Sequence, residues 1–370
     1  MASAPPLTRL LVLLVVLPVA VASGAGVGAA QEGPPAQDEG TATIDAGLRA
    51  ARARFERGER REAIADLEVL LAREPARLDV RAQLVRYDFA VHRYEAALEA
   101  ADGLGPEFDP LRGEALYLLT RYEEALALLD PAVPEHAVLR VDALEALGRL
   151  EEAARELERA FAVVGPDDVR LLGIRGRALA RAGEHAEAIA VFGRALEVDP
   201  LDLRSLYGLG RSLLAVGERE DGLAVLERHR ALVPLVDQLD FARKSLDLEP
   251  LHAPNHAAVG DALRALGRTA DARAEYEAAT RLAQDDEVVP IALRLARLLH
   301  EDERDTDAAL GVLAEAFERV NDVRLLVRAG DVCLREDRRA EAAAWFRRAL
   351  QLAPGEPAVE QRLREAEGGS

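Results

Sequence analysis

Apolar and small residues recur at spacings of three and four along most of this chain. In the segment 169–199 one such stripe begins at Leu172 and a second at Ala188, with Gly183 between them. This spacing places residues on one side of an α-helix, and glycine tolerates the positive φ that a tight turn requires. The segment therefore predicts two antiparallel helices joined by a short turn.

The helix pair recurs about every 34 residues. A small residue one or two positions after an acidic one marks the second helix of each copy, and nine copies can be aligned on it, at Ala63, Ala97, Ala125, Ala153, Ala188, Gly222, Ala272, Ala309 and Ala342. A fixed period of this length is typical of a solenoid, in which each unit is too small to bury its own apolar side and must stack on its neighbours. Strand patterns are nearly absent, so an all-α fold is expected.

The best-defined copies share six positions, and these resemble the tetratricopeptide repeat. That family has a small residue at position 8, a turn at 15, Ala at 20, an aromatic residue or Leu at 24, Ala at 27 and Pro at 32. One copy fills them with Gly176, Gly183, Ala188, Phe192, Ala195 and Pro200, and the last with Gly330, Asp337, Ala342, Phe346, Ala349 and Pro354. The resemblance implies a right-handed superhelical solenoid of about nine helix pairs, covering residues 44–356.

Departures from the period predict local irregularities. The steps from Ala97 to Ala125 and from Ala125 to Ala153 are only 28 residues long, so the second helices there should end early. The step from Gly222 to Ala272 is 50 residues, which exceeds the usual period by 16. We expect an extra helix near 235–250, which marks either a hinge or a decayed repeat.

The two ends of the chain differ from the repeats. Residues 10–22 are apolar except for Pro18 and are followed by small residues up to Ala30, as in a secretory signal, so residues 1–30 are expected to be a cleaved signal peptide. The alternative is an uncleaved anchor, because residues 10–30 carry no charge. Residues 31–43 read as a flexible linker, and 357–370 as a helix and tail that cap the last repeat.

Composition narrows the possible partners. The net charge is −19, which argues against general nucleic-acid binding because that binding needs excess positive charge. Lys244 is the only lysine, so the cations are almost all arginines, and Cys333 is the only cysteine. No residue pattern supports a cofactor, and the pair His252 and His256 lacks a third ligand for a metal.

Function in such a solenoid is expected on the concave surface, which the first helix of each pair lines. In the resembled family, position 9 is among the exposed positions there, and its charges in this chain occur in blocks. An arginine-rich segment is predicted to bind an acidic or C-terminal segment of a protein partner, with the residues Arg170, Arg177, Arg181, Arg204, Tyr207 and Arg211. The alternative is that these arginines only pair with acidic residues of neighbouring helices.

The sequence therefore predicts a non-enzymatic scaffold, exported to the periplasm or cell envelope, that contacts a membrane only if the N-terminal segment is retained. Two rivals remain open. One is an enzyme with an acidic site in the groove, for which the candidates are Glu107, Glu114, Glu135 and Asp142. The other is a self-assembling structural protein of the envelope.

Overall fold

A computed structural model describes residues 39–368, and every regular element within that range is helical. Nine helix pairs follow one another along the chain, as the repeat pattern predicted. Their bounds are α1 (Glu39–Glu56) and α2 (Arg60–Arg73), α3 (Leu78–Ala90) and α4 (Tyr94–Ala101), α5 (Asp109–Leu118) and α6 (Tyr122–Leu128), α7 (Pro134–Ala146) and α8 (Leu150–Val164), α9 (Val169–Ala182) and α10 (His185–Val198), α11 (Leu203–Val216) and α12 (Arg219–Leu248), α13 (Ala253–Ala265) and α14 (Thr269–Leu282), α15 (Asp285–Glu301) and α16 (Thr306–Val320), and α17 (Val323–Arg335) and α18 (Arg339–Leu352). A short 3-10 helix, η1 (Pro106–Phe108), precedes α5, and α19 (Pro357–Ala366) packs against α17 and α18.

Glycines allow the helices within and between pairs to approach closely. The ring of Phe192 on α10 is fully buried between Gly176 of α9 and Gly208 of α11. A Cβ atom would lie 2.5 Å from the ring at Gly176 and 2.2 Å from it at Gly208. The small residue at position 8 and the aromatic residue at position 24 are thus two halves of one contact.

The irregular repeats confirm one prediction and correct another. Helices α4 and α6 are short, as the two 28-residue steps predicted. The 16 added residues are helical too, but they form no separate helix: they extend α12 to 30 residues, with Pro234 inside it. Proline removes only one backbone hydrogen bond, and packing of the second half of α12, including the buried Leu239 and Ala242, holds the helix together across that gap.

The start of the solenoid also lies earlier than predicted. Helix α1 begins at Glu39, so the last five residues of the predicted linker 31–43 are helical. The stretch 39–43 lacks the apolar spacing from which helices are read, and the pattern therefore missed it. The predicted signal segment 1–30 and the remainder of the linker lie outside the described residues.

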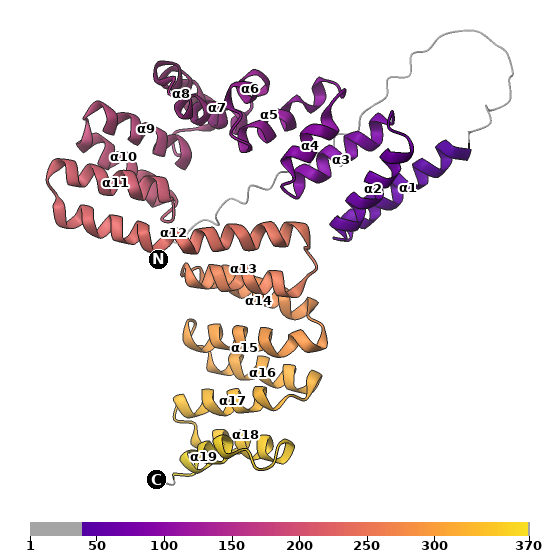
Figure 1. Cartoon of the computed structure of the whole chain (residues 1–370). Coiled ribbons are helices and arrows are strands. Elements are labelled where there is room, and N and C mark those ends of the chain that lie inside the picture. The colour runs from indigo at the N-terminus through magenta and orange to yellow at the C-terminus, as the bar shows by residue number, and fades with distance from the viewer. Residues whose placement is uncertain (1–38, 369–370) are drawn as a thin grey trace.

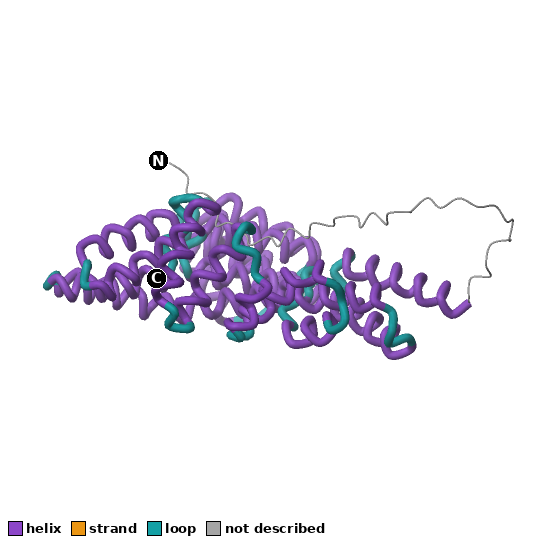
Figure 2. Tube along the Cα trace, turned by 90° about the horizontal axis from the view of Figure 1, so that it is seen from above, coloured by secondary structure: helices purple, strands orange, loops and turns teal. Residues whose placement is uncertain are grey.

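Helices α1 to α12 form an arc, and α13 to α19 form a straight stack that leaves the arc below α12 (Figure 1). Seen from above, the molecule is much thinner than it is wide (Figure 2). One continuous apolar core runs through the stack, from Leu239 on α12 to Ala366 on α19, whereas the arc contains several smaller clusters. Helix α12 is therefore the boundary between two parts of the solenoid.

The arc closes on itself, because its first repeats contact the end of α12. His92 Nε2, in the turn after α3, lies 3.0 Å from Asp247 Oδ2, and Arg61 pairs with Glu249 at 3.1 Å. Leu248 packs against the apolar cluster of α1 to α3. Gly58, in the turn between α1 and α2, faces Pro250 and Leu251 so closely that a Cβ atom would lie 2.9–3.0 Å from their side chains. We call this contact the arc closure.

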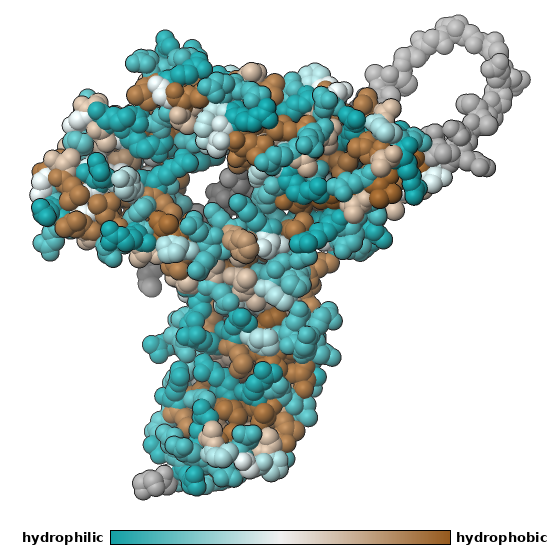
Figure 3. All heavy atoms as spheres, in the orientation of Figure 1, coloured by the Kyte–Doolittle hydropathy of each residue, from teal (hydrophilic) through white to brown (hydrophobic). Residues whose placement is uncertain are grey.

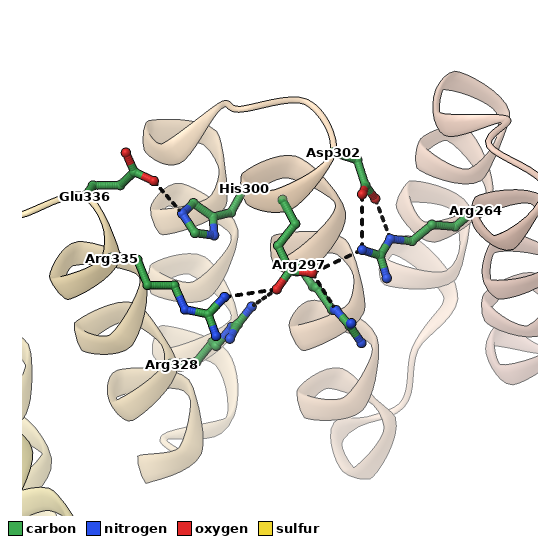
Figure 4. A network of polar contacts seen from close by, with 8 residues as sticks. Arg264, Arg297, His300, Asp302, Arg328, Arg335 and Glu336 are labelled. Carbon is green, nitrogen blue, oxygen red and sulfur yellow. Dashed lines mark hydrogen bonds and ion pairs between the residues drawn. The ribbon is translucent and has the colours of Figure 1, made fainter.

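Ion pairs connect the first helices of the stack. Glu301 at the end of α15 accepts hydrogen bonds from four arginines on three helices (Figure 4), namely Arg264, Arg297, Arg328 and Arg335. Burial alone would raise the pKa of the Glu301 carboxyl, but the bonds and charges of Arg297 and Arg328 outweigh it and lower the pKa to about 2. Glu301 is thus the common acceptor that links α13, α15 and α17.

Replacing Glu301 by Gln should destabilise the stack by about 1–2 kcal/mol near neutral pH, allowing for the partial exposure of the carboxylate. Because the folded-state pKa lies below the ordinary value, this contribution is complete above about pH 4.5 and is lost as the pH falls toward 2. Hydrogen exchange of α13 to α17 at pH 7 and at pH 3 measures this contribution of Glu301 to stability. Glu318→Gln removes a single exposed partner of Arg348 and should change neither profile; equal effects of the two variants would contradict the prediction.

Candidate functional site

A small pocket on the arc gathers polar side chains from four successive first helices, α5, α7, α9 and α11. Its volume is about 170 Å³. The polar side chains in its lining are Tyr117, Asp142, Arg170, Arg177, Asp202 and Arg204. Gly173 also lines the pocket and leaves room for the charged groups around it. We call this site the arginine–aspartate pocket.

Asp142 on α7 organises the pocket. Its carboxylate accepts a hydrogen bond from the Tyr117 hydroxyl of α5 and one from Arg204 of α11 at 2.9 Å, and Arg177 of α9 lies 3.5 Å away. Burial raises the pKa of Tyr117, and the bond to Asp142 raises it further, so the hydroxyl stays a donor. Burial lowers the pKa of Arg204, but the attraction of Asp142 more than compensates and keeps it raised.

The structure separates the six predicted residues into two groups. Arg170, Arg177 and Arg204 line the arginine–aspartate pocket, and Arg181 lies one turn beyond Arg177 on α9, where both bind the buried Glu145. All four have acidic partners within the chain, since Arg170 also pairs with Asp168 at 3.2 Å. The pairing that the sequence left as an alternative is therefore present, and acidic residues of the chain neutralise these four arginines.

Tyr207 belongs to a second pocket, between α11 and α12. This pocket has a volume of about 360 Å³ and is lined by Tyr207, Leu226, His229, Arg230, Val233 and Pro234. The rings of Tyr207 and His229 lie with their centroids 5.5 Å apart. Arg211 follows Tyr207 by one turn on α11, and among the described residues it has no ion pair and no side-chain hydrogen bond. It is exposed to solvent.

The four acidic residues considered for catalysis do not form one site. Glu114 lies 3.1 Å from the buried His136, whereas Asp142 binds Tyr117 and Arg204. Glu107 and Glu135 line neither of the two pockets described above. Within residues 39–368 no group of three or more potential metal ligands occurs, and His256 instead contacts Glu275 and the carbonyl of Pro250.

Sequence reasoning missed Tyr117 and Asp202. Tyr117 is three residues after Glu114, at position 12 of its repeat, which is one of the positions that the resembled family exposes on the concave surface. Reading position 12 together with position 9 would have found it. Asp202 caps α11, where its carboxylate accepts a hydrogen bond from the Ser205 backbone, so its sequence signal is that of a helix start.

None of the helices between residues 39 and 368 combines the length and the apolar character that crossing a membrane requires.

A search of curated proteins finds no match to the chain. Solved structures that resemble it include YrrB, described as a tetratricopeptide repeat protein with an unusual peptide-binding site, at 17% identity over 55% of this chain and 96% of that one, with a TM-score of 0.28. The Cut9–Hcn1 complex matches at 14% identity over 90% and 78%, with a TM-score of 0.32. The tetratricopeptide repeat domain of P58(IPK) matches at 17% identity over 88% and 98%, with a TM-score of 0.26.

Models of the tetratricopeptide repeat match the chain along most of the solenoid. One model matches residues 138–202, 187–236 and 298–357, a second matches 45–76, and a third matches 253–286. Together they span more than half of the 370 residues. The matches coincide with helix pairs that the structure shows stacked on one another. The chain therefore belongs to the tetratricopeptide repeat family, whose members typically bind protein or peptide partners.

Proposed function

We propose that this protein is an exported, non-enzymatic scaffold that holds an extended segment or a helix of a protein partner against its concave surface. The observation that carries the proposal is the arginine–aspartate pocket, where four first helices each contribute a polar side chain to one cavity. A binding surface built from several repeats reads an extended ligand along its length. The apolar segment at residues 10–22 supports export.

Arg204 is the arginine through which a partner carboxylate would bind. Its side chain is 63% exposed, whereas that of its internal partner Asp142 is 17% exposed. The guanidinium has five donors in a planar fork, so it can bind a second carboxylate while it keeps the first. Arg177 and Arg181 are less suited, because they hold the nearly buried carboxylate of Glu145.

Affinity capture from the envelope fraction tests the proposal. The full chain should retain a protein partner, and Arg204→Ala should lower the amount recovered at least about fivefold, as expected for the loss of an arginine at the centre of an interface. Arg155→Ala removes an exposed arginine from the second helix α8 and should leave the recovery unchanged. Identical recovery with both variants would show that the pocket does not bind the partner.

Export has its own test. Cell fractionation and N-terminal sequencing of the mature chain should place the protein in the envelope and locate its first residue after Ala22 or Ala30. A cytoplasmic protein that begins at Met1 would contradict export but would leave the groove assignment standing.

A further inference from the structure

One surface of α12 lacks the covering helix that the corresponding surfaces of the other second helices have. At the position four residues after the key small residue, the other eight copies carry a buried side chain, as for Leu67 (0% exposed), Leu157 (5%) and Phe192 (0%). The corresponding residue of α12 is Leu226, which is only partly covered. Leu223, three residues earlier on α12, is 51% exposed.

The extension of α12 explains the exposure. In the other copies the next first helix follows directly and packs between the two helices of the preceding pair, as α11 does against α9 and α10. Here the added residues carry α13 away from α11 and place it beneath the second half of α12 (Figure 1). Asn255 of α13 donates a hydrogen bond to the carbonyl of Ser245 there. The position beside α11 and the first half of α12 is left open.

The open position is largely apolar, although it includes Arg230, and it continues along one side of α12 as far as Phe241 in the second half of that helix. Leu223, Arg230, Pro234 and Phe241 follow one another at spacings of seven, four and seven, which places them on one side of α12. Phe241 is 75% exposed, and Tyr207 on α11 is 49% exposed. Apolar residues are visible at the surface over this part of the arc (Figure 3). We call the surface formed by Tyr207, Leu223, Leu226, Val233 and Phe241 the α11–α12 face.

The charged residue at position 9 of the first helices indicates what kind of helix would cover this face. Position 9 of a first helix repeatedly pairs with the next first helix, as in Glu114 with His136, Asp142 with Arg177, Asp261 with Arg294, and Asp331 with Arg362. Arg211 occupies position 9 of α11 and has no such partner among the described residues, because the next first helix is absent. A helix that filled the open position would therefore need a carboxylate opposite Arg211.

We propose that the α11–α12 face binds an amphipathic α-helix of another protein, whose apolar stripe covers Leu223 and Phe241 and whose carboxylate pairs with Arg211. The bound helix takes the place of the first helix that the extension of α12 displaced. The arc closure limits its length, because Leu248 already packs against the first repeats. The inference rests on the proposed role as an interaction scaffold and specifies a second surface for it.

Site-specific photo-cross-linking tests this proposal with the full chain in its producing cells. The photoreactive residue p-benzoylphenylalanine replaces Leu223 in one variant and Leu352 of α18, an exposed leucine far along the stack, in the control. Both sites are exposed, so folding should be unaffected, and equal melting curves verify this. The cross-linked peptide from Leu223 should be an amphipathic segment of another protein that contains Asp or Glu, and Leu352 should not capture it.

Charge reversal then tests the pairing. Arg211→Glu should lower the cross-link yield at Leu223 about five- to tenfold, and replacing the partner carboxylate by Arg should restore it. Arg243→Glu is the matched control, because Arg243 is an exposed arginine of α12 that lies on another side of the helix from Phe241. An unchanged yield with Arg211→Glu would overturn the assigned ion pair.

Three other results would overturn the proposal: cross-links from Leu223 to a second copy of this chain, cross-links to residues 1–38 of the same chain, or a yield no greater than at Leu352. Any of these can occur while Arg204→Ala still reduces capture through the arginine–aspartate pocket. Failure of the helix site is therefore distinguishable from failure of the scaffold function.

Discussion

Gly208→Ala should destabilise the arc by about 2–3 kcal/mol, a large effect for the addition of one methyl group. The new Cβ would lie 2.2 Å from Cζ of Phe192, and the ring cannot retreat because the backbone of α9 at Gly176 holds its other side. Either α11 must move away from α10 or the ring must leave its fully buried position. Both changes loosen the interface between two repeats, which is the source of stability in a solenoid.

Gly193→Ala is the matched control, since Gly193 follows Phe192 on α10 and no atom lies within 4 Å of the Cβ that it would gain. That variant should be stabilised by about 0.5–1 kcal/mol, because alanine favours a helix interior over glycine. Thermal unfolding together with hydrogen exchange of α9 to α11 measures both changes. Similar exchange rates in the two variants would show that the close approach at Gly208 does not matter.

Gly58→Ala should open the arc. Gly58 has a φ of +85°, so any alanine there incurs the cost of a left-handed backbone, about 1 kcal/mol. In addition the new Cβ would press against Pro250 and Leu251 at the arc closure. Apart from the packing of Leu248 against the first repeats, the other closure contacts are partly exposed ion pairs, which individually contribute little. The first repeats should therefore separate from the end of α12.

Gly183→Ala isolates the effect of the backbone, because Gly183 has the same φ of +85° and its Cβ would meet no atom within 4 Å. Both variants should lose similar turn stability, but only Gly58→Ala should increase the radius of gyration and the maximum dimension in small-angle X-ray scattering. Faster hydrogen exchange at residues 247–251 should accompany the opening. Scattering curves that coincide would mean that the arc closure tolerates the added methyl group.

The sequence predicted the elements of this fold well. The spacing of apolar residues gave the helix pairs, and the 28-residue steps gave the short helices α4 and α6, because helix length is a local property set by where Gly and Pro interrupt the pattern. The pattern was wrong at Pro234: it predicted a new helix after this residue, whereas α12 continues through it. Whether a proline ends a helix depends on what packs against the residues beyond it, and those contacts to α13 are distant in sequence.

At the candidate site, too, the sequence identified the residues but not their contacts. Position 9 identified Arg177 and Arg211 as side chains of the concave surface, yet the sequence could not decide which arginine already had a partner. Arg177 meets Asp142 and Glu145 because α7 and α9 stack directly, whereas Arg211 has no partner within residues 39–368 because α13 does not stack on α11. Pairing depends on which helices become neighbours, and that is not encoded in the residues of one repeat.

The sequence by itself thus determined the family, the repeat architecture and the places where the period changes, since each follows from residue types at short spacings. Only the tertiary structure decided what those changes do. The 16 added residues continue α12, bring its end to the first repeats to close the arc, and leave the α11–α12 face open. These consequences arise because each repeat stacks on the one before it, so a change in how one repeat stacks moves every later helix. Only the assembled solenoid shows where each later helix lies.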